Sequence, residues 1–233
     1  MRIFQKGFNF SQDGPGNRLV YHLQGCNMHC PWCSNPEGME FSGGREYTAE
    51  EIINECKRSK AMFFSGGGVT FTGGEATLQA KELLEVLMGL KAAGIHTAIE
   101  TNATSDSLPA ISEYVDYLIM DFKHYDGEVL KRVTGANLGK IRDNLERLLK
   151  TRSQLHIRIP LINGFNADGA LRFAVLFREF DMGACVFEFL PYHEYGKEKW
   201  KSEYKVTDGF INKEQLSAFI EAFKKYNLKI INT

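Results

Sequence analysis

Short apolar runs alternate with amphipathic stretches along most of the chain. Runs of strand length lie at 18–23, 69–72, 96–101, 117–122, 155–160 and 186–190. Helical patterns lie at about 48–60, 78–93, 138–150 and 168–180, and a last one starts at about 212. Strands that alternate with helices at this spacing predict an α/β fold, a parallel sheet with helices packed outside. Right-handed crossovers would curl six such units into a partial (β/α)6 barrel of the TIM-like kind.

Terminator and capping residues mark several of the predicted helices. Thr48 and Glu51 form a capping-box pattern, Gly94 is a stop signal, and Asp168 is expected to cap a helix. Polar candidates follow the strands: the cysteine loop at 26–33, Glu75, Glu100, Thr101, Asp121, Arg158 and His193. Binding sites form at the carboxyl ends of parallel strands, so these side chains are expected to share one site.

The composition is that of an ordinary soluble protein. The chain has 233 residues, 43% hydrophobic and 24% charged, which predicts a single domain over 1–233. A net charge of -1 gives no reason to expect nucleic acid or an anionic membrane as partner. No apolar run reaches the roughly 18 residues of a membrane-spanning helix. The first residues also lack the pattern of a signal peptide, so a cytoplasmic location is expected.

Three of the five cysteines lie within eight residues, at Cys26, Cys30 and Cys33, with C-x3-C-x2-C spacing. Thiolates suit iron–sulfur clusters, zinc or copper(I). Structural zinc usually takes four protein ligands, for which His22 or His29 would be needed here. A cluster held by three cysteines leaves one iron open for a substrate, and this interpretation is favoured over zinc and over unligated thiols.

The other two cysteines, Cys56 and Cys185, stand alone in a probable helix and at the start of an apolar strand. An odd number of cysteines without a secretory signal argues against a disulfide framework. Both are expected to be small buried apolar residues.

The residues around the cysteines resemble those of a known family. The spacing after the first strand is similar to the signature of the radical S-adenosylmethionine (radical SAM) superfamily, and the flanking segments resemble its glycyl-radical-enzyme activases. Five segments carry this resemblance: Gly14–Arg18, Gln24–Cys26, Trp32–Pro36, Val69–Ala76 and Leu190–Trp200. The last of these resembles the activases of pyruvate formate-lyase. No cysteine lies between Ser34 and Tyr47, so one cluster and no inserted ferredoxin domain are expected.

The resemblance implies one 4Fe–4S cluster on Cys26, Cys30 and Cys33, with S-adenosylmethionine chelating the open iron. It also assigns to the cofactor site Trp32, Ser34, Asn35, Gly73, Gly74, Glu75, Thr101 and Asn102. Glycines let backbone approach a ligand closely, and Glu75 or the backbone beside it can accept from the ligand ammonium. A simple strand-to-helix turn is the alternative for Gly-Gly-Glu. Ala103 departs from the glycine that relatives often carry.

Five charged or titratable residues complete the expected site. Relatives place two aspartates where this chain has Glu100 and Asp121, around a monovalent cation; the longer Glu100 side chain predicts a weaker or absent cation site. Arg158 can bind the co-substrate carboxylate, or pair with Glu100 or Asp121. Lys123 is a further candidate for the carboxylate. His193 is placed by the resemblance near adenine, with a structural role as the alternative.

The implied activity is that of an activase. Reductive cleavage of S-adenosylmethionine gives a 5′-deoxyadenosyl radical, which removes hydrogen from a glycine of a glycyl radical enzyme; pyruvate formate-lyase is the favoured partner. Flavodoxin or ferredoxin is expected as electron donor, and the chain is expected to be a monomer. The alternatives are activation of another glycyl radical enzyme, a radical SAM reaction on a small molecule, or a non-catalytic zinc or electron-transfer module.

Overall fold

The computed structural model describes residues 1–10 and 12–231 as two compact units. The first unit comprises 1–27, 35–101 and 105–119, and the second comprises 28–34, 102–104 and 120–233, of which the last two residues lie outside the described part. Among the described residues no helix combines the length and the apolar character needed to cross a membrane. The expectation of one domain over the whole chain stays a prediction.

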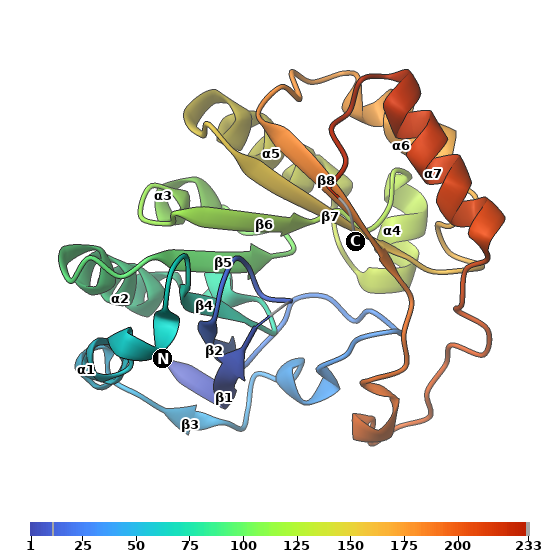
Figure 1. Ribbon diagram of the computed structural model, residues 1–233. Coiled ribbons are helices and arrows are strands. Elements are labelled where there is room, and N and C mark those ends of the chain that lie inside the picture. Colours follow the sequence, from blue (N-terminus) through green and yellow to red (C-terminus); the bar gives the residue numbers. More distant parts are fainter. Residues whose placement is uncertain (11, 232–233) are drawn as a thin grey trace. The chain divides into compact units, whose positions relative to one another are not determined.

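The strands and helices follow the predicted alternation (Figure 1). The strands are β1 (Arg2–Asn9), β2 (Arg18–Leu23), β3 (Arg45–Glu46), β4 (Gly68–Gly73), β5 (Thr97–Thr101), β6 (Tyr117–Asp121), β7 (Leu155–Leu161) and β8 (Cys185–Pro191). The helices are α1 (Ala49–Arg58), α2 (Ala80–Ala92), α3 (Leu108–Ser112), α4 (Gly127–Thr134), α5 (Leu138–Thr151), α6 (Ala170–Phe177) and α7 (Lys213–Lys225). The six predicted strands are confirmed as β2 and β4 to β8.

In the first unit the strand order is β3-β1-β2-β4-β5-β6, and of β6 only residues 117–119 belong to this unit, while 120–121 belong to the second. β2, β4 and β5 are parallel, whereas β1 runs antiparallel to both β2 and β3. The two antiparallel strands were not predicted, because half of the β1 residues are exposed and the strand shows no apolar period. They extend a mainly parallel α/β sheet, so the predicted fold class is confirmed.

Arg18 lies at the amino end of β2 and is fully buried. Its guanidinium donates to the Thr70 hydroxyl (2.5 Å) and to the Val69 and Pro15 carbonyls (2.6 and 2.9 Å). Burial lowers the pKa of Arg18 to about 10. Arg18 therefore joins the Gly14–Arg18 segment to β4. This contact lies at the amino end of β2, whereas the cysteine loop follows its carboxyl end.

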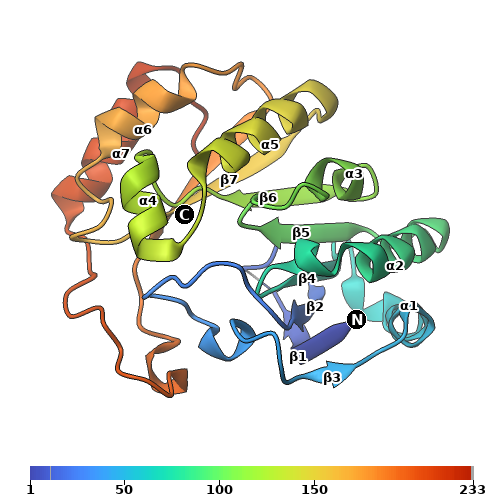
Figure 2. The same ribbon diagram turned by 180° about the vertical axis from the view of Figure 1, so that it is seen from behind.

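In the second unit the strand order is β6-β7-β8, with β7 and β8 parallel and Arg158 directly opposite Glu188. α6 and α7 lie side by side (Figures 1 and 2). Fully buried phenylalanines pack between these helices and β8: the Phe177 and Phe187 ring centroids are 4.8 Å apart, and those of Phe189 and Phe223 are 4.9 Å apart. Edge-to-face pairs of this kind each add about 1 kcal/mol beyond their burial.

Most predicted helix boundaries are correct. The capping boxes of Thr48 and Asn212 are both formed. Asp168 was the wrong cap, because α6 starts after Gly169 and Asp168 instead accepts a hydrogen bond from the Gln215 side chain at 2.9 Å. The predicted helix at about 78 starts as a 3-10 turn over Ala76–Gln79, with α2 following at Ala80.

Candidate active site

The first part of the cysteine loop, up to Asn27, belongs to the first unit and is held by backbone hydrogen bonds. The Gly25 amide donates to the Gly38 carbonyl (2.8 Å), and the Cys26 amide donates to the Met39 carbonyl (3.1 Å). The Gln24 side chain adds a donor to the Glu37 carbonyl at 2.8 Å. The backbone between β2 and Cys26 is therefore held in place by residues 37–39, which follow the cysteine loop.

Gly73 and Gly74 pack directly against this part of the loop. Gly73 has a φ of 109°, and a Cβ there would lie 2.5 Å from the Leu23 nitrogen. A Cβ on Gly74 would lie 2.1 Å from the Gly25 carbonyl oxygen and 2.6 Å from that of Gly38. Only glycine allows these backbones to approach so closely. The structure thus gives both glycines a packing role beside Cys26.

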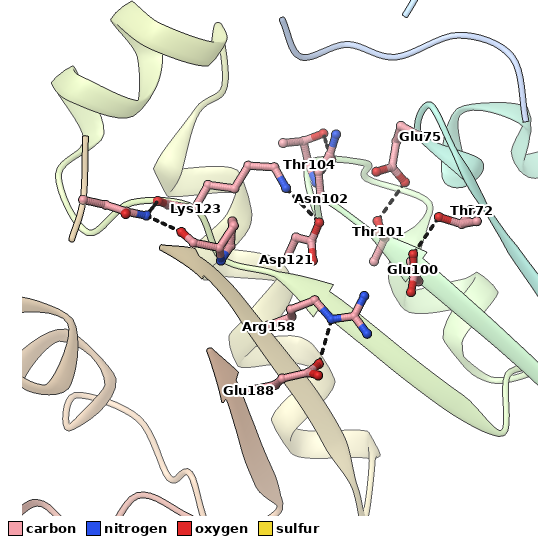
Figure 3. Close-up of polar contacts among 12 residues, drawn as sticks. Thr72, Glu75, Glu100, Thr101, Asn102, Thr104, Asp121, Lys123, Arg158 and Glu188 are labelled. Carbon is pink, nitrogen blue, oxygen red and sulfur yellow. Dashed lines mark hydrogen bonds and ion pairs between the residues drawn. The ribbon is translucent and has the colours of Figure 1, made fainter. Parts of the chain in front are cut away.

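Glu75 is 1% exposed, and its carboxylate accepts hydrogen bonds from neighbouring protein groups. Its Oε1 accepts from the Thr77 amide (3.1 Å), from the Thr77 hydroxyl, and from the Thr101 hydroxyl (2.7 Å, Figure 3). Glu75 therefore caps the 3-10 turn that follows β4, the turn that was the alternative interpretation. The Glu75 amide also donates to the Gly25 carbonyl at 2.8 Å, which ties the turn to the loop.

Residues 28–34 of the loop belong to the second unit. The Cys33 amide donates to the Cys30 carbonyl (3.1 Å), so Cys-Pro-Trp-Cys forms a single turn. The Trp32 ring packs on Phe165, with centroids 4.5 Å apart, and Phe165 packs on His124 at 4.7 Å. Trp32 is thereby held by the loop that follows β7, and its place beside the cluster stays a prediction.

The donor set suits the group that the sequence predicts. All three thiols are free of disulfides, and Cys30 is 7% exposed. Three thiolates in one loop match an iron–sulfur cluster better than a four-ligand zinc site. Across residues 1–10 and 12–231 no three histidine, cysteine or acidic side chains form a ready-made metal site, so the three-cysteine site stays a prediction from the sequence.

Thr101, Glu100 and Asn102 mark the end of β5. The Thr72 hydroxyl donates to Glu100 at 2.8 Å within the first unit (Figure 3). In the second unit the Asn102 side chain accepts from the Thr104 amide (3.1 Å) and hydroxyl (2.7 Å), which forms a local turn. Ala103 in this turn is buried with a φ of 59°, a left-handed conformation that glycine adopts without cost. Ala103 therefore holds a backbone conformation that favours glycine.

Asp121 and Lys123 form an ion pair at the end of β6, with 2.8 Å between Lys123 Nζ and Asp121 Oδ2 (Figure 3). The Lys123 ammonium thus places a positive charge next to the Asp121 carboxylate. That the monovalent-cation site near Glu100 and Asp121 is weak or absent stays a prediction. The Lys123 charge beside Asp121 is a further reason to expect it, because that charge repels a cation. The Lys123 carbonyl accepts from the buried Asn166 side chain at 2.8 Å, which fixes the turn after the strand.

Arg158 forms an ion pair with Glu188, a partner that was not predicted. Pairing of Arg158 with Glu100 or Asp121 stays a prediction. Arg158 Nε donates to Glu188 Oε2 at 2.8 Å (Figure 3), and His156 Nε2 lies 3.0 Å from the same oxygen. Burial opposes ionisation of Glu188, but the hydrogen bond from His156 and the charge of Arg158 hold its pKa at about 2. The arginine is thus oriented by the neighbouring strand.

Replacement of Glu188 by glutamine is expected to destabilise the apoprotein by about 3 kcal/mol at pH 7, because the Glu188 carboxylate that Arg158 and His156 stabilise is lost. A depressed carboxyl pKa stabilises the fold above the unfolded-state pKa of about 4.3, and this contribution disappears as the pH falls toward 2. Urea unfolding of both proteins from pH 2.5 to 7 measures the difference. A gap between parent and variant that does not narrow below pH 4.5 would contradict this assignment.

His193 follows β8, and its ring stacks on Tyr195 with centroids 4.3 Å apart. The Tyr195 amide donates to His193 Nδ1 at 3.4 Å, and burial lowers the histidine pKa, which favours the neutral ring. A contact between His193 and adenine stays a prediction. Sequence reasoning missed Trp200, whose indole N–H donates to the Cys33 carbonyl at 3.1 Å. The resemblance of Leu190–Trp200 pointed to this segment, but not to that contact.

Known proteins resemble the chain over most of its length. The family model of the radical SAM superfamily matches residues 20–176. The chain belongs to the radical SAM superfamily. A pyruvate formate-lyase-activating enzyme of Clostridium pasteurianum is 34% identical to this radical SAM enzyme over 204 residues, 84% of this chain and 85% of that protein. The activating enzyme of that name from Staphylococcus aureus strain USA300 is 33% identical over 202 residues, covering 82% and 80% of the two chains.

A solved structure agrees with these sequence relatives. A domain of the pyruvate-formate lyase-activating enzyme of Bacteroides vulgatus is 27% identical, with a TM-score of 0.60. The match covers 71% of this chain and 98% of that domain. The fold class and the family resemblance predicted from the sequence are therefore confirmed. Membership of the radical SAM superfamily implies a 4Fe–4S cluster and S-adenosylmethionine.

Proposed function

We propose that this radical SAM enzyme activates a glycyl radical enzyme, and that pyruvate formate-lyase is its partner. The observation that carries the proposal is identity of 33–34% to activating enzymes of that name over more than four fifths of the chain. The compact loop between Ser34 and Tyr47, which contains no cysteine, supports one cluster and no inserted ferredoxin domain.

The residues of the chain have separable tasks in this proposal. Cys26, Cys30 and Cys33 would hold the cluster, which when bound supplies the electron that cleaves the carbon–sulfur bond of S-adenosylmethionine to methionine and a 5′-deoxyadenosyl radical. Gly73 and Gly74 would hold the backbone beside Cys26 in place, because only glycine allows their close packing against Leu23 and Gly25, and their own backbone would contact the co-substrate. No acid–base pair is required, because the enzyme has to orient the reactants and exclude water.

The remaining polar residues would bind the co-substrate. Arg158, oriented by Glu188, offers a fixed guanidinium to its carboxylate, and Lys123 offers a second positive charge. Asn102 and Thr101 offer polar groups at the end of β5, with the Thr101 hydroxyl already donated to Glu75. Trp32, Ser34 and Asn35 would border the cluster, and His193 would lie near adenine.

Anaerobic reconstitution followed by electron paramagnetic resonance tests the proposal. The reduced protein should give a 4Fe–4S signal that changes when S-adenosylmethionine is added. Addition of pyruvate formate-lyase should produce a glycyl radical doublet and one methionine for each radical formed. Cleavage without a doublet on this partner, but with one on another glycyl radical enzyme, would favour that enzyme; cleavage that needs only a small molecule would overturn activation. Reduced flavodoxin and ferredoxin can be compared as electron donors in the same assay.

A further inference from the structure

A segment far from the cysteines in sequence holds the last part of their loop. Residues 195–204, here called the clamp segment, contact Cys33 and Ser34 within the second unit. The Trp200 indole Nε1–H donates to the Cys33 carbonyl at 3.1 Å, and Lys199 Nζ donates to the Ser34 carbonyl at 3.1 Å. A Cβ on Gly196 would lie 2.4 Å from Ser34 Cα and 2.7 Å from the Cys33 carbonyl oxygen.

The clamp segment is itself anchored to the sheet of that unit. The Trp200 and Tyr204 ring centroids are 5.7 Å apart, and the Tyr204 hydroxyl lies 2.8 Å from the Tyr192 hydroxyl. Tyr192 is buried, and its amide donates to the Leu161 carbonyl at the end of β7 at 3.0 Å. A continuous series of contacts therefore connects the end of β7 to the backbone of Cys33.

The loop needs such support because it has little structure of its own. Residues 24–34 contain no helix or strand, and Cys33 lies at the end of the turn that starts at Cys30. Groups that orient a ligand without touching the metal commonly change metal affinity by about 10- to 100-fold when they are removed. A half-buried indole donor is directional and neutral, whereas the exposed Lys199 ammonium can exchange its contact with water.

We propose that Trp200 is a positioning residue that fixes Cys33 for cluster binding, with Gly196 providing the space for the contact. The proposal rests on membership of the radical SAM superfamily and does not depend on which protein is activated. Trp200 would act through the Cys33 backbone, so its loss should affect retention of the cluster more than the fold of the apoprotein.

Trp200→Phe tests the inference, because phenylalanine keeps an aromatic ring but has no N–H donor. The reconstituted variant, without S-adenosylmethionine or partner, should lose iron to an anaerobic chelator about tenfold faster than the parent. Its reduced-cluster paramagnetic resonance spectrum should also be broadened. Gly196→Ala should have the same two effects, because Gly196 has an ordinary φ of -92° and the three atoms nearest to the added methyl group all belong to Cys33 and Ser34.

Tyr204→Phe is the matched control, since it removes a hydrogen bond of the clamp segment without removing a contact to Cys33. Thermal unfolding of each apoprotein separates positioning from a general loss of stability. Unchanged iron loss and an unchanged spectrum in both Trp200→Phe and Gly196→Ala would overturn the inference. Equal iron loss in Tyr204→Phe and Trp200→Phe would also overturn it, because the effect would then be loosening of the whole segment.

Discussion

Cys30→Ala should bind no stable 4Fe–4S cluster and cleave no S-adenosylmethionine. Cys30 is the middle ligand of the predicted set and the most buried of the three. The two residues between Cys30 and Cys33 are Pro31 and Trp32, and neither side chain can replace the lost sulfur as a ligand. The two remaining thiolates would leave two irons of the cluster without a protein ligand, so the cluster should not be retained. Iron and sulfide content, with the paramagnetic resonance spectrum of the reduced protein, measures the loss.

Cys56→Ala is the control for this experiment. Cys56 is fully buried in α1 beside Tyr21, whose hydroxyl lies 3.7 Å from its sulfur, and burial raises its pKa to about 12. This variant should keep the cluster and lose only a little stability. A full cluster signal in Cys30→Ala, or loss of the signal in Cys56→Ala, would show that the ligands have been assigned wrongly.

Gly74→Ala should give the second large effect. The added methyl group would overlap the carbonyl oxygens of Gly25 and Gly38, and neither backbone can move without displacing the other. Steric overlap of this kind costs about 1–3 kcal/mol, and the Gly25–Cys26 backbone would shift with it. We expect lower apoprotein stability in urea and a reconstituted cluster content well below that of the parent.

Gly7→Ala is a matched substitution in β1, where nothing lies within 4 Å of the position of the new Cβ. It should leave both cluster content and stability close to those of the parent. If Gly74→Ala behaves like Gly7→Ala, the close approach of the glycine backbones beside Cys26 does not constrain the loop.

The alternation of strands and helices was visible in the sequence because each buried strand is a short segment rich in apolar residues. The strand β1 was not, since only Ile3 among its residues is buried and the rest are half-buried or exposed. Helix α4 was also missed, although Asp126 caps its start and Gly135 ends it in a left-handed conformation. Those two residues were the available signal, but the apolar period over eight residues is too short to stand out.

The partners of the predicted site residues were harder to foresee than the residues themselves. Arg158 was recognised as a buried charge that needs a partner, yet Glu188 is its neighbour only through the register of β7 and β8. Parallel register depends on the intervening crossover and leaves no local mark in either strand. The contact of Trp200 with Cys33 joins residues 167 positions apart, and it depends in the same way on the completed fold.

The burial of the two solitary cysteines gives the folded protein a useful chemical property. Cys185 is 1% exposed with a pKa raised by burial to about 12, and Cys56 is in the same condition. Alkylating reagents attack the thiolate, so at neutral pH both side chains should be almost unreactive. Adducts counted by intact-protein mass spectrometry would then report on the cysteine loop alone. A comparison of adduct counts before and after cluster reconstitution would therefore measure how many thiols of the cysteine loop the cluster protects.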